Sequence, residues 1–266
     1  MKRTPARVRI DRLLVDKGLV ESREKAARHI LAGDVFVDGE RVDKAGALVA
    51  SAAEVELKGK APFVSRGGEK LIHAIDHFQI KVPGRVCLDV GASTGGFTDC
   101  LLQRGATRVY AVDVGTGQLD QKLRKDQRVV VMEHTNARSL DPRVFGDQPT
   151  LAVIDVSFFS LEKILPAVFG VLASRGEVVA LVKPQFEVGR EHVGKGGFVR
   201  DPVQHRAAVQ RLARYVVLRG WHVLGVTASP LRGPKGNHEF FLYFTSHGRT
   251  PADLESMISR SVEALA

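Results

Sequence analysis

The segment that most constrains the fold is a short apolar run, RVCLDV, that leads directly into the glycine-rich run GASTGGF. The first run predicts a buried strand, and Phe97, Cys100 and Leu101 then recur with the spacing of a helix. Glycine lets the backbone turn sharply and approach a ligand closely, and doubly wound α/β sheets bind ligands at the carboxyl ends of their strands. We therefore expect an α/β fold with a ligand-binding turn at 91–96.

The spacing around this turn narrows the class of ligand. Asp89, Gly91 and the pair Gly95-Gly96 follow the pattern D-x-G-x-x-x-G-G, which differs from the dinucleotide fingerprint G-x-G-x-x-G and has no Walker lysine. A second apolar run, RVYAVDV, ends in Asp113, about 20 residues after Gly91, where related folds hold ribose hydroxyls with a carboxylate. The pattern predicts a nucleotide-type cofactor that is not a dinucleotide.

Positive charge is concentrated near the amino terminus. The chain has 39 Lys and Arg against 30 Asp and Glu, a formal net charge of +9, and more than half of this excess lies in residues 1–32. Such an excess favours a polyanionic partner, with a solvated charged surface as the alternative.

Two short helices and a hairpin are expected in this basic region. Apolar residues at helical spacing predict a helix over 9–17, and Ser22 is a good N-cap for a second helix that ends at Gly33. Valines then alternate on both sides of Asp38-Gly39, which is typical of a β-hairpin. The region thus predicts a small α+β domain.

The pattern over residues 7–58 resembles the small two-helix RNA-binding domain found in a small-subunit ribosomal protein, pseudouridine synthases and some tRNA synthetases. The resemblance implies that a basic helix pair contacts the phosphate backbone of folded RNA. We expect this domain to cover 1–60, a linker 61–64 and a second domain 65–266. The expected phosphate contacts are made by Arg9, Arg12, Arg23, Lys25 and Arg28.

The glycine turn resembles motif one of the S-adenosyl-L-methionine-dependent methyltransferases. The resemblance implies that Asp113 binds the ribose hydroxyls of this cofactor and that Asn136, just after a third strand, contacts the adenine. A plain turn residue is the alternative interpretation of Asn136. The residues expected around the methionine part are Asp89, Gly91, Gly95 and Gly96.

Four charged residues lie where this fold exposes side chains to the ligand. Asp155 and Lys183 each end an apolar run, Glu239 precedes a last strand, and Lys70 lies early in the first helix of the second domain. Burying an unpaired charge costs several kcal/mol, so such charges are paired, functional or both. The order Lys, Asp, Lys, Glu resembles the catalytic tetrad of the FtsJ-type ribose 2′-O-methyltransferases.

Together with the basic domain and the runs VSRGGEKL, DVSFFSL, LVKPQFEVG and GNHEFF, the resemblance narrows to the TlyA family. It implies a Rossmann-like S-adenosyl-L-methionine-dependent methyltransferase domain with a small N-terminal α+β RNA-binding domain. It also implies 2′-O-methylation of cytidine in ribosomal RNA, with ribosomal RNA or ribosomal subunits as partners. The modified nucleotide, the subunit that carries it and the oligomeric state stay open.

The expected chemistry accounts for the residue types of the tetrad. A ribose hydroxyl is a poor nucleophile, so its attack on a methyl group requires a proton acceptor and cationic support for the developing alkoxide. Lys183 is the candidate base, and Lys70 would supply a neighbouring charge that favours its neutral form. Asp155 and Glu239 would orient the two lysines. Simple electrostatic stabilisation by Lys183 is the alternative.

Several other classes of site are disfavoured. Cys87 and Cys100 fit neither a redox pair nor a zinc site and are interpreted as buried hydrophobes. No metal is expected, with His73 and His77, four residues apart, as a minor alternative. No apolar run reaches the roughly 18 residues that cross a bilayer, so a cytoplasmic enzyme without a membrane partner is expected.

Two other functions compete with that of a methyltransferase. A noncatalytic RNA-binding or ribosome-assembly factor would not need the tetrad, and a pore-forming haemolysin would need a membrane-inserting segment. The glycine-rich segment 187–202 is interpreted as a mobile loop over the RNA. Pro251 is expected at the first position of a C-terminal packing helix.

Overall fold

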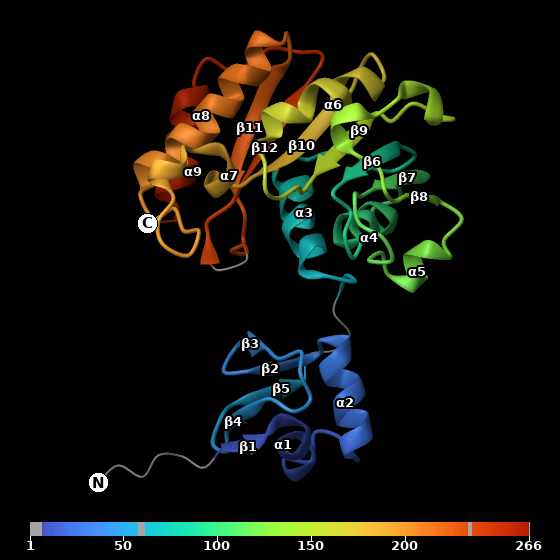
Figure 1. The fold of residues 1–266 in the computed structure, drawn as a ribbon, viewed down its shortest axis with the longest axis vertical. Helices are drawn as coiled ribbons and strands as arrows, with labels where there is room; N and C mark the ends of the chain where they lie inside the picture. The colour runs from blue at the N-terminus through green and yellow to red at the C-terminus, as the bar shows by residue number, and fades with distance from the viewer. Residues whose placement is uncertain (1–6, 58–61, 234–235, 266) are drawn as a thin grey trace. The chain divides into compact units, whose positions relative to one another are not determined.

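The computed structural model describes residues 7–57, 62–233 and 236–265, and the chain divides into two compact units, Met1–Pro62 and Phe63–Ala266 (Figure 1). Residue 61 of the predicted linker lies outside the described residues. Over the described residues, the first unit has one apolar core, and the second unit has two.

The first unit contains two helices and two small antiparallel sheets, β1 with β4 and β3-β2-β5. Its elements are β1 (Arg7–Arg9), α1 (Ile10–Asp16), α2 (Arg23–Ala32), β2 (Val35–Val37), β3 (Glu40–Arg41), β4 (Leu48–Ala50) and β5 (Val55–Leu57). Ser22 caps α2 as predicted, because its Oγ accepts a hydrogen bond from the Lys25 amide at 3.2 Å. The predicted hairpin is confirmed, with positive φ at both Asp38 and Gly39, as a type I′ turn requires.

The second unit is built on a seven-stranded sheet in the order β11-β12-β10-β9-β6-β7-β8. Strands β8, β7, β6, β9 and β10 are parallel, whereas β12 is antiparallel to β10 and β11. The strands are β6 (Val86–Val90), β7 (Arg108–Val112), β8 (Val129–Met132), β9 (Leu151–Ile154), β10 (Glu177–Val182), β11 (His222–Ala228) and β12 (Phe240–Thr245). The α/β class is therefore confirmed.

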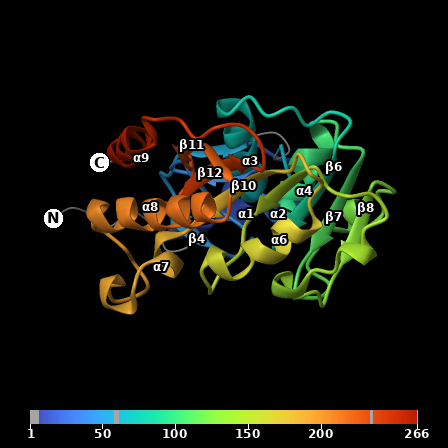
Figure 2. The same cartoon turned by 90° about the horizontal axis from the view of Figure 1, so that it is seen from above.

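Helices cover both faces of this sheet, and Figure 2 shows the strands between α3 on one side and α6 and α8 on the other. Leu71 of α3 and Leu101 of α4 belong to one buried core, and Val168 of α6 and Leu212 of α8 belong to the other. The helices are α3 (Arg66–His77), α4 (Gly96–Gln103), α5 (Gln121–Arg124), α6 (Leu165–Val171), α7 (Pro184–Glu187), α8 (Pro202–Leu218) and α9 (Leu254–Glu263). Short 3₁₀ turns lie at Ala137–Ser139, Pro142–Val144, Leu161–Lys163 and Arg190–His192.

The two cysteines behave as the sequence indicates. Cys87 on β6 and Cys100 on α4 are free and fully buried in the core beneath α3 and α4. Burial raises the pKa of each thiol to about 12. Neither thiol ionises near neutral pH, which agrees with a packing role.

One expectation about the carboxyl-terminal half is corrected, and another stays untested. The last helix begins at Leu254 and not at Pro251, because 251–253 form a turn in which the Leu254 amide donates to the Pro251 carbonyl. The segment 187–202 is attached to the rest of the second unit at two points, and its mobility and its place over the RNA stay a prediction. Glu187 is the buried last residue of α7, and the Val199 amide is anchored on Asn237 Oδ1 at 3.1 Å.

Candidate active site

The glycine turn at the end of β6 brings two strand ends into direct contact. Gly91 has φ +85°, and its amide donates to the Val112 carbonyl of β7 at 2.8 Å. A Cβ atom at this position would lie 2.4 Å from the backbone oxygen of Asp155, which follows β9. Glycine is therefore required both by the backbone conformation and by the close approach of the neighbouring strand end.

Asp113 lies just beyond β7 and is held rigidly. Its two carboxylate oxygens accept hydrogen bonds from the Ser93 amide at 2.8 Å and the Gly115 amide at 2.7 Å. Each carboxylate oxygen can accept a second bond, so the group can still receive a pair of ligand hydroxyls. This is the position at which nucleotide-binding folds recognise a ribose.

A cavity of about 360 Å³ opens beside this carboxylate. Gly91, Asp113, Asn136, Asp155 and Phe158 are among the residues that line it. Asn136 also caps the following 3₁₀ turn, because its Oδ1 accepts from the Arg138 amide at 3.0 Å. The turn role of Asn136 is thus present, and its adenine contact stays a prediction.

Asp89 and Gly95 line neither this cavity nor the one described next. Asp89 is fully buried on β6, and burial raises the pKa of its carboxyl to about 7, although Thr98 Oγ1 donates to its Oδ2 at 2.6 Å. Its Oδ1 has no hydrogen-bond partner. A Cβ at Gly95 would meet Leu123 at 2.3 Å. Both residues lie on the side of the turn that faces the apolar core. Their contact with a cofactor stays a prediction.

A second cavity, of about 340 Å³, lies on the other side of the glycine turn. Lys70, Asp155 and Lys183 all line it, together with Gly91 and Gly96. Asp155 and Gly91 belong to both cavities. The structure therefore brings three of the four tetrad residues together, next to the predicted cofactor cavity.

Lys183 is held at the end of β10 by two neighbours. Its Nζ donates to Ser157 Oγ at 2.9 Å and lies 2.5 Å from Asp155 Oδ1, an ion pair without hydrogen-bond geometry. The Lys183 side chain is 9% exposed, whereas that of Asp155 is 24% exposed. The lysine is therefore shielded from bulk water, and its nitrogen is positioned inside the cavity.

Glu239 reaches this cavity only through Lys70. Lys70 Nζ donates to Glu239 Oε2 at 2.6 Å, and both side chains are buried. The other oxygen, Oε1, has no hydrogen-bond partner. The two lysines are thus each paired with a carboxylate, and the four residues form two ion pairs.

Sequence reasoning missed Ser157 and Phe158, which lie two and three residues after Asp155. Phe158 has φ +75° and is 89% exposed, an unfavourable conformation for a large side chain and an unusual exposure for a phenylalanine. Its ring centroid lies 5.7 Å from that of Phe186 on α7. The signal in the sequence was the dipeptide Phe158-Phe159 just beyond a strand end that carries a charge.

In the first unit, Asp11 joins two of the five predicted phosphate contacts. Its carboxylate accepts from Arg9 Nη2 at 3.0 Å and Arg23 Nη2 at 2.8 Å. The hydrogen bond from Arg9, followed by that from Arg23, holds the pKa of the Asp11 carboxyl well below its usual range. Both guanidinium groups stay half exposed or more.

The other three predicted phosphate contacts form exposed ion pairs four residues apart. These pairs join Arg12 with Asp16, Lys25 with Glu21, and Arg28 with Glu24. Exposed pairs of this kind contribute only about 0.3–0.5 kcal/mol. An RNA phosphate can therefore replace the carboxylate of each of these three pairs at little cost in free energy. RNA binding by all five basic residues stays a prediction.

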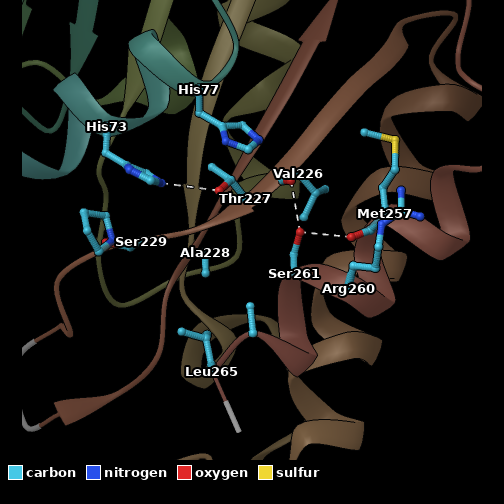
Figure 3. Close-up of a pocket in the computed structure, with 12 residues that line it drawn as sticks. His73, His77, Val226, Thr227, Ala228, Ser229, Met257, Arg260, Ser261 and Leu265 are labelled. Atoms are coloured by element: carbon cyan, nitrogen blue, oxygen red, sulfur yellow. Dashed lines mark hydrogen bonds between the residues drawn. The ribbon is translucent and has the colours of Figure 1, made fainter.

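A third cavity, of about 550 Å³, lies between α3, the end of β11 and α9 (Figure 3). His73 and His77 line it, and His73 Nε2 lies 3.4 Å from Thr227 Oγ1. Burial lowers the pKa of His73. Over the residues that the structure describes, no group of three or more His, Cys, Asp or Glu side chains is arranged to hold a metal ion.

The pore-forming hypothesis requires a segment that enters a membrane. Among the described residues, no helix combines the length and the apolar composition needed to span a bilayer.

Comparisons with known proteins agree with this architecture. Residues 63–246 match the model of the FtsJ-like methyltransferases and residues 8–55 that of the S4 domain. The chain is 47% identical to the Mycobacterium tuberculosis 16S/23S rRNA (cytidine-2′-O)-methyltransferase TlyA over 96% of this chain and 97% of the relative. It is 43% identical to Hemolysin A of Brachyspira hyodysenteriae over 89% of this chain and 99% of the relative.

A solved structure from Streptococcus thermophilus is similar along the whole chain, with a TM-score of 0.76, 42% identity and 98% of each chain covered. The sheet, the glycine turn and these matches define a methyltransferase that carries an S4 domain. The chain belongs to the TlyA family. The resemblance seen in the sequence is therefore confirmed.

Proposed function

We propose that this chain transfers a methyl group from S-adenosyl-L-methionine to the ribose 2′-hydroxyl of cytidine in ribosomal RNA. The observation that carries the proposal is the meeting of Lys70, Asp155 and Lys183 in one cavity beside the glycine turn. The name of the Mycobacterium tuberculosis relative supplies the substrate class. A scaffold without catalytic function would not require three charged side chains to converge there.

The residues around the first cavity are suited to this cofactor. Asp113 offers a fixed carboxylate for two ribose hydroxyls, and the Gly91 turn leaves no side chain between the cavity and the backbone. Val156 and Phe159 add apolar walls suited to adenine. When bound, S-adenosyl-L-methionine supplies an electrophilic methyl group on a positively charged sulfur.

In the proposed mechanism, Lys183 acts in its neutral amine form and accepts the proton of the ribose hydroxyl while the hydroxyl oxygen bonds to the methyl carbon and the bond from that carbon to sulfur breaks. Asp155 and Ser157 hold its nitrogen in the cavity, so the group is oriented before the substrate binds. Lys70 supplies positive charge near the developing alkoxide. Glu239 fixes Lys70 through the buried ion pair and is a positioning residue.

Phe158 is suited to contact the base of the target nucleotide. A nucleotide in structured RNA must leave its stack before an enzyme reaches its 2′-hydroxyl in a closed cavity, and exposed aromatic side chains stabilise unstacked bases. Phe158 lines the cofactor cavity and is exposed at its edge. We assign it a stacking role toward the RNA.

The direct test of the function is to map 2′-O-methyl groups by mass spectrometry on ribosomal RNA from cells with and without the gene. The proposed function predicts at least one 2′-O-methylcytidine that disappears with the gene and returns with the purified protein. Identical methylation patterns in the two strains would reject it.

Removing the Asp113 carboxylate should weaken cofactor binding. A hydrogen bond to a charged group contributes about 1.5–3 kcal/mol, so Asp113→Ala should lower the affinity for S-adenosyl-L-methionine roughly ten- to a hundredfold. Isothermal titration calorimetry measures this change. Asp147→Ala, which removes an exposed carboxylate paired with Arg108, is the matched control. Unchanged affinity in a folded Asp113→Ala protein would contradict the assignment.

The first unit should contribute RNA affinity that falls steeply with salt. Each lost phosphate contact lowers the slope of log affinity against log salt concentration by about 0.7–0.9, so Arg12→Ala should flatten it by one such step. Filter binding to ribosomal RNA between low and moderate salt measures the slope. Arg219→Ala, at the end of α8 against Tyr215, is the control. An equal slope in wild type and Arg12→Ala would argue against a phosphate contact.

A further inference from the structure

A fourth cavity, of about 310 Å³, adjoins the second cavity, which Lys70 and Asp155 line. The two cavities share Lys183 and Ser157. Phe158, Phe186 and Val193 form apolar walls. A largely apolar cavity with few polar groups is typical of a site for a flat, partly polar ligand. Because it opens beside the proposed base, a nucleoside whose ribose lies at Lys183 can place its base here.

Two side-chain amides line this cavity, Gln185 and Asn237, and they differ in what they can offer a ligand. Both polar atoms of the Asn237 amide already have a protein partner, since Oδ1 accepts from the Val199 amide at 3.1 Å and Nδ2 donates to the Gly197 carbonyl at 2.8 Å. Gln185 Oε1 is shielded from solvent and has no hydrogen-bond partner. A shielded acceptor without a partner is unfavourable, and a ligand donor would satisfy it.

We propose that Gln185 reads the Watson–Crick edge of the target base in this cavity and thereby selects cytidine. The inference rests on the proposed function and names the residue that determines its base specificity. Gln185 lies two residues after Lys183, on α7 (Pro184–Glu187). Because the connection is short, the position of Gln185 is tied to that of Lys183, the proposed proton acceptor.

Cytosine has the groups that this amide requires. Its exocyclic N4 amino group donates, and the adjacent N3 accepts, so one glutamine amide can pair with both atoms through Oε1 and Nε2. Uracil presents a donor at N3 and an acceptor at O4, the reverse order. An amide that presents Oε1 to the exocyclic group of the base and Nε2 to N3 pairs with cytosine, whereas on uracil the same arrangement sets acceptor against acceptor and donor against donor.

The test compares cytidine with uridine at the methylated position. The substrate is the ribosomal subunit in which mass spectrometry locates the modification, prepared with the natural cytidine or with uridine there. Single-turnover methylation by wild type is expected to be faster on cytidine. Gln185→Met keeps the length of the side chain and removes the amide, so it should slow the cytidine reaction roughly ten- to a hundredfold and bring the ratio of the two rates close to one.

Two control measurements accompany this test. Gln148→Met replaces an exposed glutamine in the loop before β9 and should retain the wild-type rate and ratio. Affinity for S-adenosyl-L-methionine should be unchanged in Gln185→Met, which excludes misfolding as the cause. A Gln185→Met protein that keeps the wild-type cytidine preference would overturn the proposal. A wild-type protein that methylates neither subunit would reject the proposed function itself.

Discussion

Substituting arginine for Lys183 is expected to abolish methyl transfer while leaving cofactor and RNA binding nearly intact. Arginine keeps the positive charge next to Asp155 but does not release its proton in a protein. General acid–base catalysis contributes typically ~10²–10⁴ in rate, so the single-turnover rate on bound ribosomal RNA should fall by a factor in that range. The same substitution at Lys70 should have a smaller effect, because that residue supplies charge and orientation.

The larger guanidinium could also displace the ribose, so a second variant is needed. Lys183→Met is close in length and uncharged, and it should be at least as slow as Lys183→Arg. Lys81→Arg, an exposed lysine before β6, controls for the general effect of the substitution. Retention of most of the single-turnover rate in Lys183→Arg would show that charge and not proton transfer carries the step.

The second large effect is expected on stability, at the buried pair of Lys70 and Glu239. Glu239→Gln preserves the shape of the side chain but leaves the Lys70 ammonium without a counter-charge. Removing one partner of a buried ion pair typically destabilises a protein by ~3–5 kcal/mol, which for a domain of this size lowers the melting temperature by roughly 6–20 °C. Thermal unfolding followed by circular dichroism measures the change.

A double substitution distinguishes the effect of the Lys70–Glu239 pair on stability from its effect on methyl transfer. Lys70→Met combined with Glu239→Leu removes both charges, and such replacements are often neutral or stabilising. The double variant should therefore unfold at a higher temperature than Glu239→Gln but still lack methyl transfer. If it were both stable and active, Lys70 would have no role in the reaction.

The parts of the fold that depend on strong local signals were predictable. The strand before Gly91, the strand that ends near Asp113 and the N-cap at Ser22 lie where sequence patterns predict them, because glycine, side-chain caps and apolar runs act over a few residues. Strands β1, β4 and β5 were not predicted, since three residues are too few to show alternation.

The four tetrad residues were singled out because isolated charges stand out beside apolar runs and because their order resembles the FtsJ-type tetrad; their catalytic role stays a prediction. Their pairing was not predictable, since the contact between Lys70 and Glu239 joins residues 169 positions apart. The positions of Asp89 and Gly95 behind the turn, and the exposure of Phe158, also depend on how neighbouring strands and loops pack. Local sequence patterns carry no information on such distant contacts.

The contact between Gly91 and the backbone of Asp155 has a consequence for how inhibitors and variants should be interpreted. Under the proposed function, a compound that fills only the cavity beside Asp113 lies against Gly91 and Asp155, and Asp155 is the partner of Lys183. Such a compound need not reach the methyl-transfer position to disturb the reaction. Resistance substitutions in the turn should accordingly lower turnover as well as drug affinity, which limits the routes by which this site can escape inhibition.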